Sequence, residues 1–408
     1  RETITAEILR ADVNDEHKVD FKVQNQVVHQ LSVYVTDGTS NYIVKHVVWL
    51  GTEADIVACD AGQVVGVCVC GRGRGVRGAR VPTRRVLQYG MPRQRDAMVM
   101  VPPHARDQFL TSLDTEGVSH YVHIEDVAQA LEKHDADISS WRSSRAPRMI
   151  FQDYQRYAEW VTTPVALYSV YRLVENLRPQ DRDLLHDIDW IILPVVNPDG
   201  YEYSHTTDRL WRKTRSIDES VSTTCVGVDG NRNFDVRHGQ GTPADPCQNT
   251  YAGPRPFSEP ETGYVRDILA EHKDRVQIFM DIHSHGNYVL FAYGDTTLPP
   301  NALQIFLVGA AMGAAMDAIK LPQAGFYRVG NSASVLYPSS GSAQDYGQVA
   351  GAATSYTLEL PGYGYGFLVP PHYMDHVNEE TWQGIAVTAR YSRALYRQRY
   401  NAASNTQP

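Results

Sequence analysis

The chain has 408 residues, of which 42% are hydrophobic and 21% are charged. This is the composition of an ordinary globular protein, and the length suits two or three domains with a large buried core. The formal net charge of −9 argues against nucleic-acid binding by the chain as a whole. No apolar run reaches the length of a membrane span, and no apolar leader opens the sequence, so the N-terminus leaves export undecided.

Residues 1–85 contain strand-like runs and form an N-terminal region to which we attach no function. A GxGxxG pattern at Gly73, Gly75 and Gly78 follows one of these runs. A dinucleotide site would also need a helix that opens at the last glycine, but Pro82 follows at once and no helical apolar period appears. The pattern therefore favours a basic linker over a nucleotide site or an Arg/Gly-rich nucleic-acid segment.

The next part of the chain alternates strands and helices. AMVMV and SHYVHI read as strands, and ARDQFLTSLDTEG and EDVAQALEKH read as helices. We predict a small α+β unit over residues 86–145. The polar stretch WRSSRAPR (141–148) has no periodicity and suits an exposed linker that a trypsin-like protease could cut near Arg142, Arg145 or Arg148.

Residues 150–400 continue the alternation with longer elements. TPVALYSVYRLVENL reads as an amphipathic helix, and the nearly all-apolar DWIILPVV (189–196) reads as a strand with both faces covered. Two further strands are VQIFMDI and TSYTLEL, and a capping box from Ser258 to Glu261 predicts a helix start. The pattern indicates an α/β domain with a mixed, mainly parallel sheet flanked by helices.

Polar residues at the ends of the buried strands suggest a site, because ligands bind beyond the carboxyl ends of strands in open α/β sheets. His283 ends one strand and could ligate zinc, while Glu359 ends another and could act as general base toward a metal-bound water. Arg232 beside Asn231 suits a carboxylate ligand. Singly, each residue also fits a structural role. Their joint occurrence, in this order along the chain, favours a fold in which they converge on a single cleft.

The chain has five cysteines, which are too few for a disulfide scaffold. Cys225 and Cys247 bracket a loop rich in Gly, Asn and Pro, so a pairing between them is plausible. Cys68 and Cys70 are too close together for the usual zinc spacing, and we interpret them as cysteines of a strand.

Five segments together resemble the zinc metallocarboxypeptidases of the pancreatic A/B type: RLWRKTRS, CVGVDGNRNFD, GPRPFSEPET, DIHSHGNYVLFAYG and SYTLELPGYGYGFLVPP. The resemblance covers about 159–395, and residues 96–140 are similar to the second half of the family's activation segment. It implies a secreted, monomeric zinc exopeptidase that removes one residue from peptide or protein C-termini. Cys225 and Cys247 match the family disulfide.

The resemblance also implies roles in zinc binding and catalysis. Glu159 and His283 match two zinc ligands. Glu359 matches the glutamate that activates the zinc-bound water, and Arg212 matches the arginine that holds the developing oxyanion.

Substrate-binding roles follow in the same way. Asn231 and Arg232 match the pair that grips the terminal carboxylate, and Tyr337 matches the mobile tyrosine that closes over the substrate. Gln344 occupies the position that selects the side chain. Because glutamine is neutral, we expect apolar, aromatic or neutral polar C-terminal residues rather than charged ones.

The sequence departs from the family pattern at the first zinc ligand. The family has His-x-x-Glu followed by Trp, whereas here Arg156 precedes Glu159 and Trp160, and arginine cannot ligate zinc. FQDYQRYAEW (151–160) also resembles the start of the family's catalytic domain. On this interpretation, several dozen residues that the family has between that start and the helix of Glu159 are absent from the sequence. HVNE at 376–379 has the right spacing but lies in the lead-in to the last helix.

Three interpretations follow. The first is an active carboxypeptidase in an incompletely assembled form. The second is a catalytically impaired homologue that binds peptides without stable zinc, and the third is an unrelated function of residues 1–85. We favour the first, because Glu359, Arg212, Asn231 and Arg232 are all retained.

Overall fold

The computed structural model describes residues 33–35, 43–45, 65–69, 85–88, 97–115, 118–143, 161–273 and 275–404. The chain divides into two compact units, Arg1–Asp135 and Ala136–Pro408. Several positions singled out in the sequence lie outside the described residues, namely the GxGxxG pattern, Cys70, Arg145, Arg148, Arg156, Glu159 and Trp160. None of the described helices combines the length and hydrophobicity of a bilayer-spanning segment.

The first unit contains a four-stranded antiparallel sheet. Its strand order is β4 (Arg85–Gln88), β5 (Ala97–Val101), β3 (Val65–Val69) and β6 (His120–Ile124). β3 includes Cys68, and it comes from the region before residue 86, so the sheet extends beyond the predicted start of the α+β unit. A separate antiparallel pair joins β1 (Val33–Val35) to β2 (Ile43–Lys45).

The core of the first unit lies between its sheet and α1 (Pro103–Thr115). Ala105, Phe109 and Leu113 are spaced by four residues, so they share one face of the helix and pack against β5. Helix α2 (Val127–Ser143) follows β6 along the chain.

The second unit contains a mixed sheet, which confirms the predicted fold class. Its strand order is β7 (Ile278–Ser284), β10 (Thr354–Leu360), β8 (Tyr288–Phe291) and β9 (Arg328–Asn331). β10 is parallel to β7, β8 is parallel to β9, and the central pair of β10 and β8 is antiparallel.

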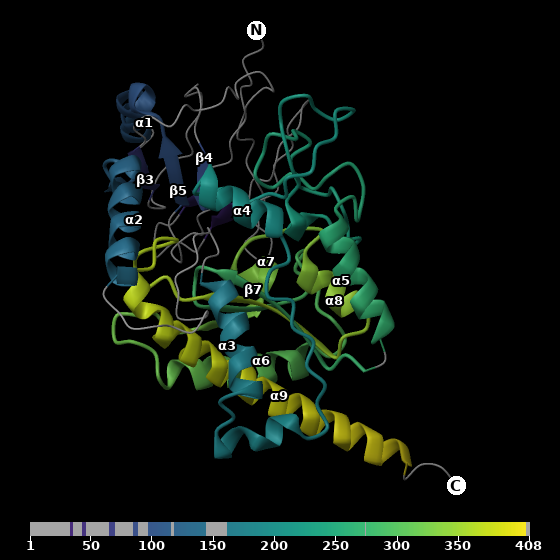
Figure 1. Cartoon of the computed structure of the whole chain (residues 1–408). Coiled ribbons are helices and arrows are strands. Elements are labelled where there is room, and N and C mark those ends of the chain that lie inside the picture. The colour runs from purple at the N-terminus through teal and green to yellow at the C-terminus, as the bar shows by residue number, and fades with distance from the viewer. Residues whose placement is uncertain are drawn as a thin grey trace. The chain divides into compact units, whose positions relative to one another are not determined.

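Helices cover both faces of this sheet. Along β8, Val289 and Phe291 belong to the large core beneath α3 (Thr162–Val174), α6 (Ala302–Asp317) and α9 (Met374–Ser404), which lie together in Figure 1. Phe279 of β7 points to the opposite face, where α5 (Pro260–Glu271) and α8 (Ala343–Val349) pack. Because successive side chains of a strand point to opposite faces of the sheet, the same strands contribute to both cores.

The remaining helical segments are α4 (Pro198–Thr206), α7 (Ser332–Val335), η2 (Pro179–Leu185), η3 (Gly230–Arg232) and η4 (Pro371–Tyr373).

Helix α6 approaches the sheet closely because it carries glycine where it meets the strands. A Cβ atom built on Gly309 would lie 3.0 Å from Val329 and 3.2 Å from Tyr356. A larger residue would therefore push the helix away from the sheet that carries the candidate site.

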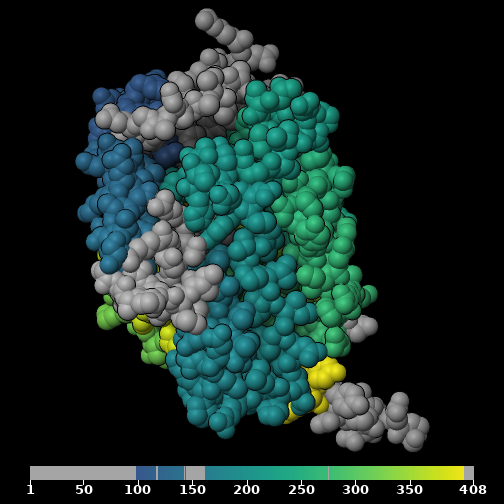
Figure 2. Space-filling view, in the orientation of Figure 1, coloured from purple at the N-terminus to yellow at the C-terminus, as the bar shows by residue number. Residues whose placement is uncertain are grey.

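The predicted strand at 189–196 is wrong, because no strand pairs with it among the described residues. Trp190 and Ile192 pack on the large core, but Ile191 and Leu193 are 51% and 37% exposed. An extended segment becomes a strand only when a neighbour takes up its backbone hydrogen bonds. Figure 2 shows the teal part of the chain, to which this segment belongs, on the surface of the second unit.

The predicted capping box is also wrong, because α5 begins at Pro260 with Glu259 as its N-cap residue. Ser258 Oγ donates to the carboxylate of Glu259 instead of capping the helix. Proline is favoured at the first helical position, since its fixed φ suits the helix and it has no N–H to satisfy.

A buried ionic network joins α3, η2 and α9. Arg172 is fully buried, and its guanidinium contacts Asp181 at 2.5 Å and Glu379 at 3.2 Å. Glu379 also pairs with Arg178 at 2.8 Å, and Trp382 donates to Asp181 at 3.3 Å. The network holds the surface segment around η2 against the C-terminal helix.

A second buried polar group is centred on Glu380, the residue of α9 that follows Glu379. The carboxylate of Glu380 is fully buried and accepts hydrogen bonds from the hydroxyls of Tyr327 at 2.8 Å and Tyr363 at 3.1 Å. His376 Nε2 lies 3.3 Å from the same carboxylate. Burial raises the pKa of Glu380 from 4.5 to about 7.

We expect this carboxylate to make the stability of the second unit depend on pH. Because the pKa is raised in the folded state, the stabilisation is complete below about pH 4.5 and is lost as the pH rises through about 7. The loss amounts to roughly 3 kcal/mol of the free energy of unfolding. Urea unfolding at pH 5 and pH 8 should show that Glu380→Gln flattens this dependence, and an equal slope in both proteins would contradict the prediction.

Candidate functional site

Two of the predicted site residues meet at the carboxyl ends of neighbouring strands. His283 and Glu359 are direct partners in the parallel register of β7 and β10. Both strands are apolar runs that end one residue later, at Ser284 and Leu360. Because parallel strands place their carboxyl ends at the same edge, the imidazole and the carboxylate are brought together there.

The imidazole of His283 is held by two side chains. Its Nε2 lies 2.7 Å from Asp281 Oδ2 and 3.0 Å from Asn231 Nδ2. The amide oxygen of Asn231 accepts the N–H of Ala343 at 2.8 Å, which directs the amide nitrogen toward His283. Asn231 thus links three segments that lie far apart in the sequence.

Asp229 organises the turn that carries the predicted carboxylate-binding pair. It is 2% exposed and accepts the N–H of Asn231 at 3.0 Å as the N-cap of η3. It also accepts from Arg212 Nε at 3.0 Å and Nη2 at 3.2 Å. The sequence prediction missed this residue, although an Asp before Gly-Asn-Arg is a recognisable N-cap signal.

Arg232 and Tyr337 also meet. Arg232 is 5% exposed, and its Nη2 donates to the hydroxyl of Tyr337 at 3.3 Å. Gln344 is 3% exposed and lies in α8, where its backbone carbonyl accepts the hydroxyl of Ser355 at 2.6 Å. The structure therefore connects the 229–232 turn to the carboxyl end of β7 through Asn231 and to Tyr337 through Arg232, whereas Gln344 contacts β10 near its beginning.

The close approach of two of these segments requires a glycine. Gly341 has a φ of +65°, and a Cβ atom there would lie 2.1 Å from the carbonyl oxygen of Arg232. The carbonyl of Gly341 accepts the N–H of Phe234 at 3.1 Å, and its N–H donates to Val236 at 2.8 Å. A side chain at this position would separate Arg232 from Tyr337.

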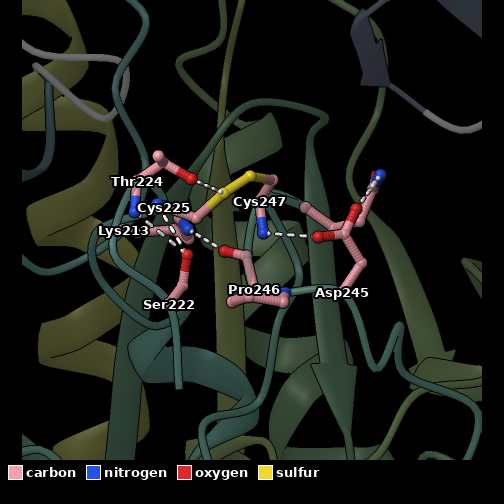
Figure 3. Close-up of a disulfide and its surroundings, with 8 residues drawn as sticks. Lys213, Ser222, Thr224, Cys225, Asp245, Pro246 and Cys247 are labelled. Atoms are coloured by element: carbon pink, nitrogen blue, oxygen red, sulfur yellow. Dashed lines mark hydrogen bonds between the residues drawn. A yellow bond between two sulfur atoms is a disulfide. The ribbon is translucent and has the colours of Figure 1, made fainter. Parts of the chain in front are cut away.

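A disulfide joins Cys225 and Cys247, as predicted (Figure 3), and the loop that it closes contains the 229–232 turn. Lys213 Nζ donates to the carbonyl of Pro246 at 2.6 Å and ties this loop to the segment after Arg212. Asp245 also lies close to both sulfur atoms. Because disulfide sulfurs are not thiolates, this group does not form a metal site.

The described residues do not fit a complete catalytic zinc site. Such a site needs three protein ligands, and the described ranges contain only His283 of the two ligands predicted, since Glu159 lies outside them. The only group of three potential ligands within the described ranges is the one at the disulfide. The alternative HVNE motif is not available, because its Glu379 is paired with Arg172 and Arg178.

Two family models match the chain. Residues 139–384 match the model described as zinc carboxypeptidase, and residues 90–134 match the model described as carboxypeptidase activation peptide. The first match extends over more than half of the chain and includes every described residue of the candidate site.

The curated proteins and solved structures that the chain resembles are also carboxypeptidases. The chain is 46% identical to carboxypeptidase B of Helicoverpa zea over 59% of its length, but it spans only 57% of that protein. It is 34% identical to carboxypeptidase B of Astacus astacus, with 67% of this chain and 90% of that protein covered. The crystal structure of carboxypeptidase A from Helicoverpa armigera is 32% identical, with a TM-score of 0.75 over 81% of this chain and 98% of that one.

Proposed function

Because the chain belongs to the zinc carboxypeptidase family, we propose that it hydrolyses the last peptide bond of peptides and releases the C-terminal amino acid. The single observation that carries this proposal is the convergence of the candidate residues. His283 and Glu359 are register partners, Asn231 contacts His283, and the adjacent Arg232 contacts Tyr337.

We assign substrate binding to the turn and the pocket. The guanidinium of Arg232 and the amide of Asn231 bind the free carboxylate, since a fork of N–H donors matches a carboxylate. Tyr337 closes over the bound residue and positions it. Gln344 faces the side chain and, being neutral, favours Phe or Leu over Lys or Glu at the C-terminus.

The chemical step is assigned to Glu359 and Arg212. Glu359 takes a proton from the attacking water, whose oxygen forms a bond to the scissile carbonyl carbon. Arg212, held in place by Asp229, stabilises the oxyanion that develops. Glu359 then gives the proton to the leaving amine as the C–N bond breaks.

Zinc is the cofactor that the family name implies. When bound, zinc polarises the carbonyl and lowers the pKa of water. His283 and Glu159 would be its ligands in this chain. Because Arg156 stands where the family pattern has its first histidine, we expect weaker zinc binding than three protein ligands would give.

Arg156 favours a second candidate function, that of a homologue that binds peptide C-termini without cleaving them. Purified chain with added zinc should be incubated with N-acylated peptides that end in Phe, Leu or Lys, and with the same peptides amidated at the C-terminus. Release of the last residue from the free acids alone would support the enzyme. Binding of the free acids without release would support the binding protein. If the free acids are neither cleaved nor bound, both candidate functions are contradicted.

We further propose that the protein is a secreted, monomeric zymogen. The activation-peptide match and the disulfide support this, since disulfides persist in oxidising compartments. Limited trypsin treatment is expected to cut first near Arg142, Arg145 or Arg148 and to raise peptide release or binding. Early cleavage elsewhere, with residues 141–148 left intact, would count against this prediction.

A further inference from the structure

The segments of the candidate site are joined by an ionic group that the proposed reaction does not use. Arg237 lies five residues after Arg232, and its Nη2 is 3.4 Å from Asp345 Oδ2. Its Nη1 forms an ion pair with Asp295, and its guanidinium lies 5.4 Å from the ring centre of Tyr293. One side chain therefore contacts both the segment after β8 and the residue that follows Gln344.

Asp345 depends on these contacts. It is fully buried, and its Oδ2 accepts the N–H of Gly294 at 2.9 Å. Its Oδ1 is buried without a hydrogen-bond partner among the residues that the structure describes. Since a buried carboxylate is costly unless it is paired, the guanidinium of Arg237 offsets a charge that the surroundings compensate only in part.

Backbone hydrogen bonds connect the same segments but do not include a charged partner. Ser339 donates to the carbonyl of Gly294 at 2.8 Å, and Gly341 donates to Val236 at 2.8 Å. Arg237 itself has a φ of +51°, a conformation that residues with a side chain seldom adopt. A strained backbone conformation persists where surrounding contacts outweigh its energetic cost. The ion pairs of the Arg237 guanidinium with Asp295 and Asp345 are contacts that offset this cost.

We propose that Arg237 is a positioning residue that holds the Tyr337–Gln344 segment against the Asn231–Arg232 turn. Without it, the pocket floor and the tyrosine would no longer keep a fixed distance from the carboxylate-binding pair. The purpose assigned to this contact rests on the proposed function, whereas the contact itself can be tested independently of it.

Hydrogen–deuterium exchange of the full chain tests the structural part. Arg237→Gln should speed exchange of the amides in 339–345 by on the order of tenfold, because a charge-assisted contact is lost. Arg237→Lys keeps the positive charge but lacks the guanidinium fork, so its exchange rate in 339–345 should lie between those of the unmodified chain and Arg237→Gln. Arg275→Gln is the control, since its ion pair with Asp189 is exposed and Arg275 makes no contact with Asp345.

Unchanged exchange in 339–345 would overturn the inference, and so would equal acceleration throughout the second unit. If Arg237→Gln does not fold, the lysine variant carries the same test. For peptide release, KM should rise on the order of tenfold with a smaller change in kcat. An unaltered KM despite faster exchange would refute the assigned purpose, whereas failure of the unmodified chain to bind or cleave peptides would refute only the proposed function.

Discussion

Glu359→Gln is expected to reduce the rate of C-terminal residue release by about 10²- to 10⁴-fold, which is the usual contribution of a general base. Glutamine has nearly the same shape but cannot accept a proton from water. The register of β10 with β7 and β8 does not depend on the charge of this side chain, so the fold should persist. The Kd of a peptide with a free C-terminus should change little, because Arg232 and Asn231 carry that contact in the proposal.

The measurement is kcat for a peptide that ends in Phe or Leu, with peptide affinity measured by calorimetry on the same sample. Glu271→Gln is a matched control, because this glutamate lies in the last turn of α5 and its side chain is 74% exposed. A folded Glu359→Gln protein whose kcat stays within tenfold of the unmodified chain would remove Glu359 from the proposed mechanism.

Arg172→Met should lower the free energy of unfolding by about 3–5 kcal/mol, because it leaves buried carboxylate charge without its partner. Asp181 is 5% exposed and contacts Arg172 at 2.5 Å. Arg390 Nη2 contacts the other oxygen of Asp181 at 3.0 Å and will compensate part of the loss, so the lower end of this range is expected.

Arg178→Met tests whether burial determines the size of this effect. Arg178 pairs with Glu379, which Arg172 also contacts, but its side chain is 36% exposed. An exposed pair contributes about 1 kcal/mol or less. Urea unfolding of both variants should therefore give clearly different midpoints. Equal losses would show that burial does not determine the size of the effect, and a loss under 1 kcal/mol for Arg172→Met would show that the network does not hold η2 to α9.

Local sequence patterns predicted the elements that are long and apolar. The segments that contain β7, β10, α1, α2 and α3 each show an apolar run or a helical apolar period, so their type could be read directly from the sequence. The short strands β8 and β9 were not predicted, because four residues carry too little pattern. The segment 189–196 was predicted as a strand because its composition is apolar, but composition does not supply the neighbouring strand that pairing requires.

The sequence by itself determined which residue types are present and where the strands that carry His283 and Glu359 end. Only the tertiary structure decided that these two residues are register partners, and that Asp229 holds Arg212. The reason is physical: residue spacing predicts periodicity within one element, whereas groups 17 to 112 residues apart meet only when the packing of the sheet and its loops brings them together.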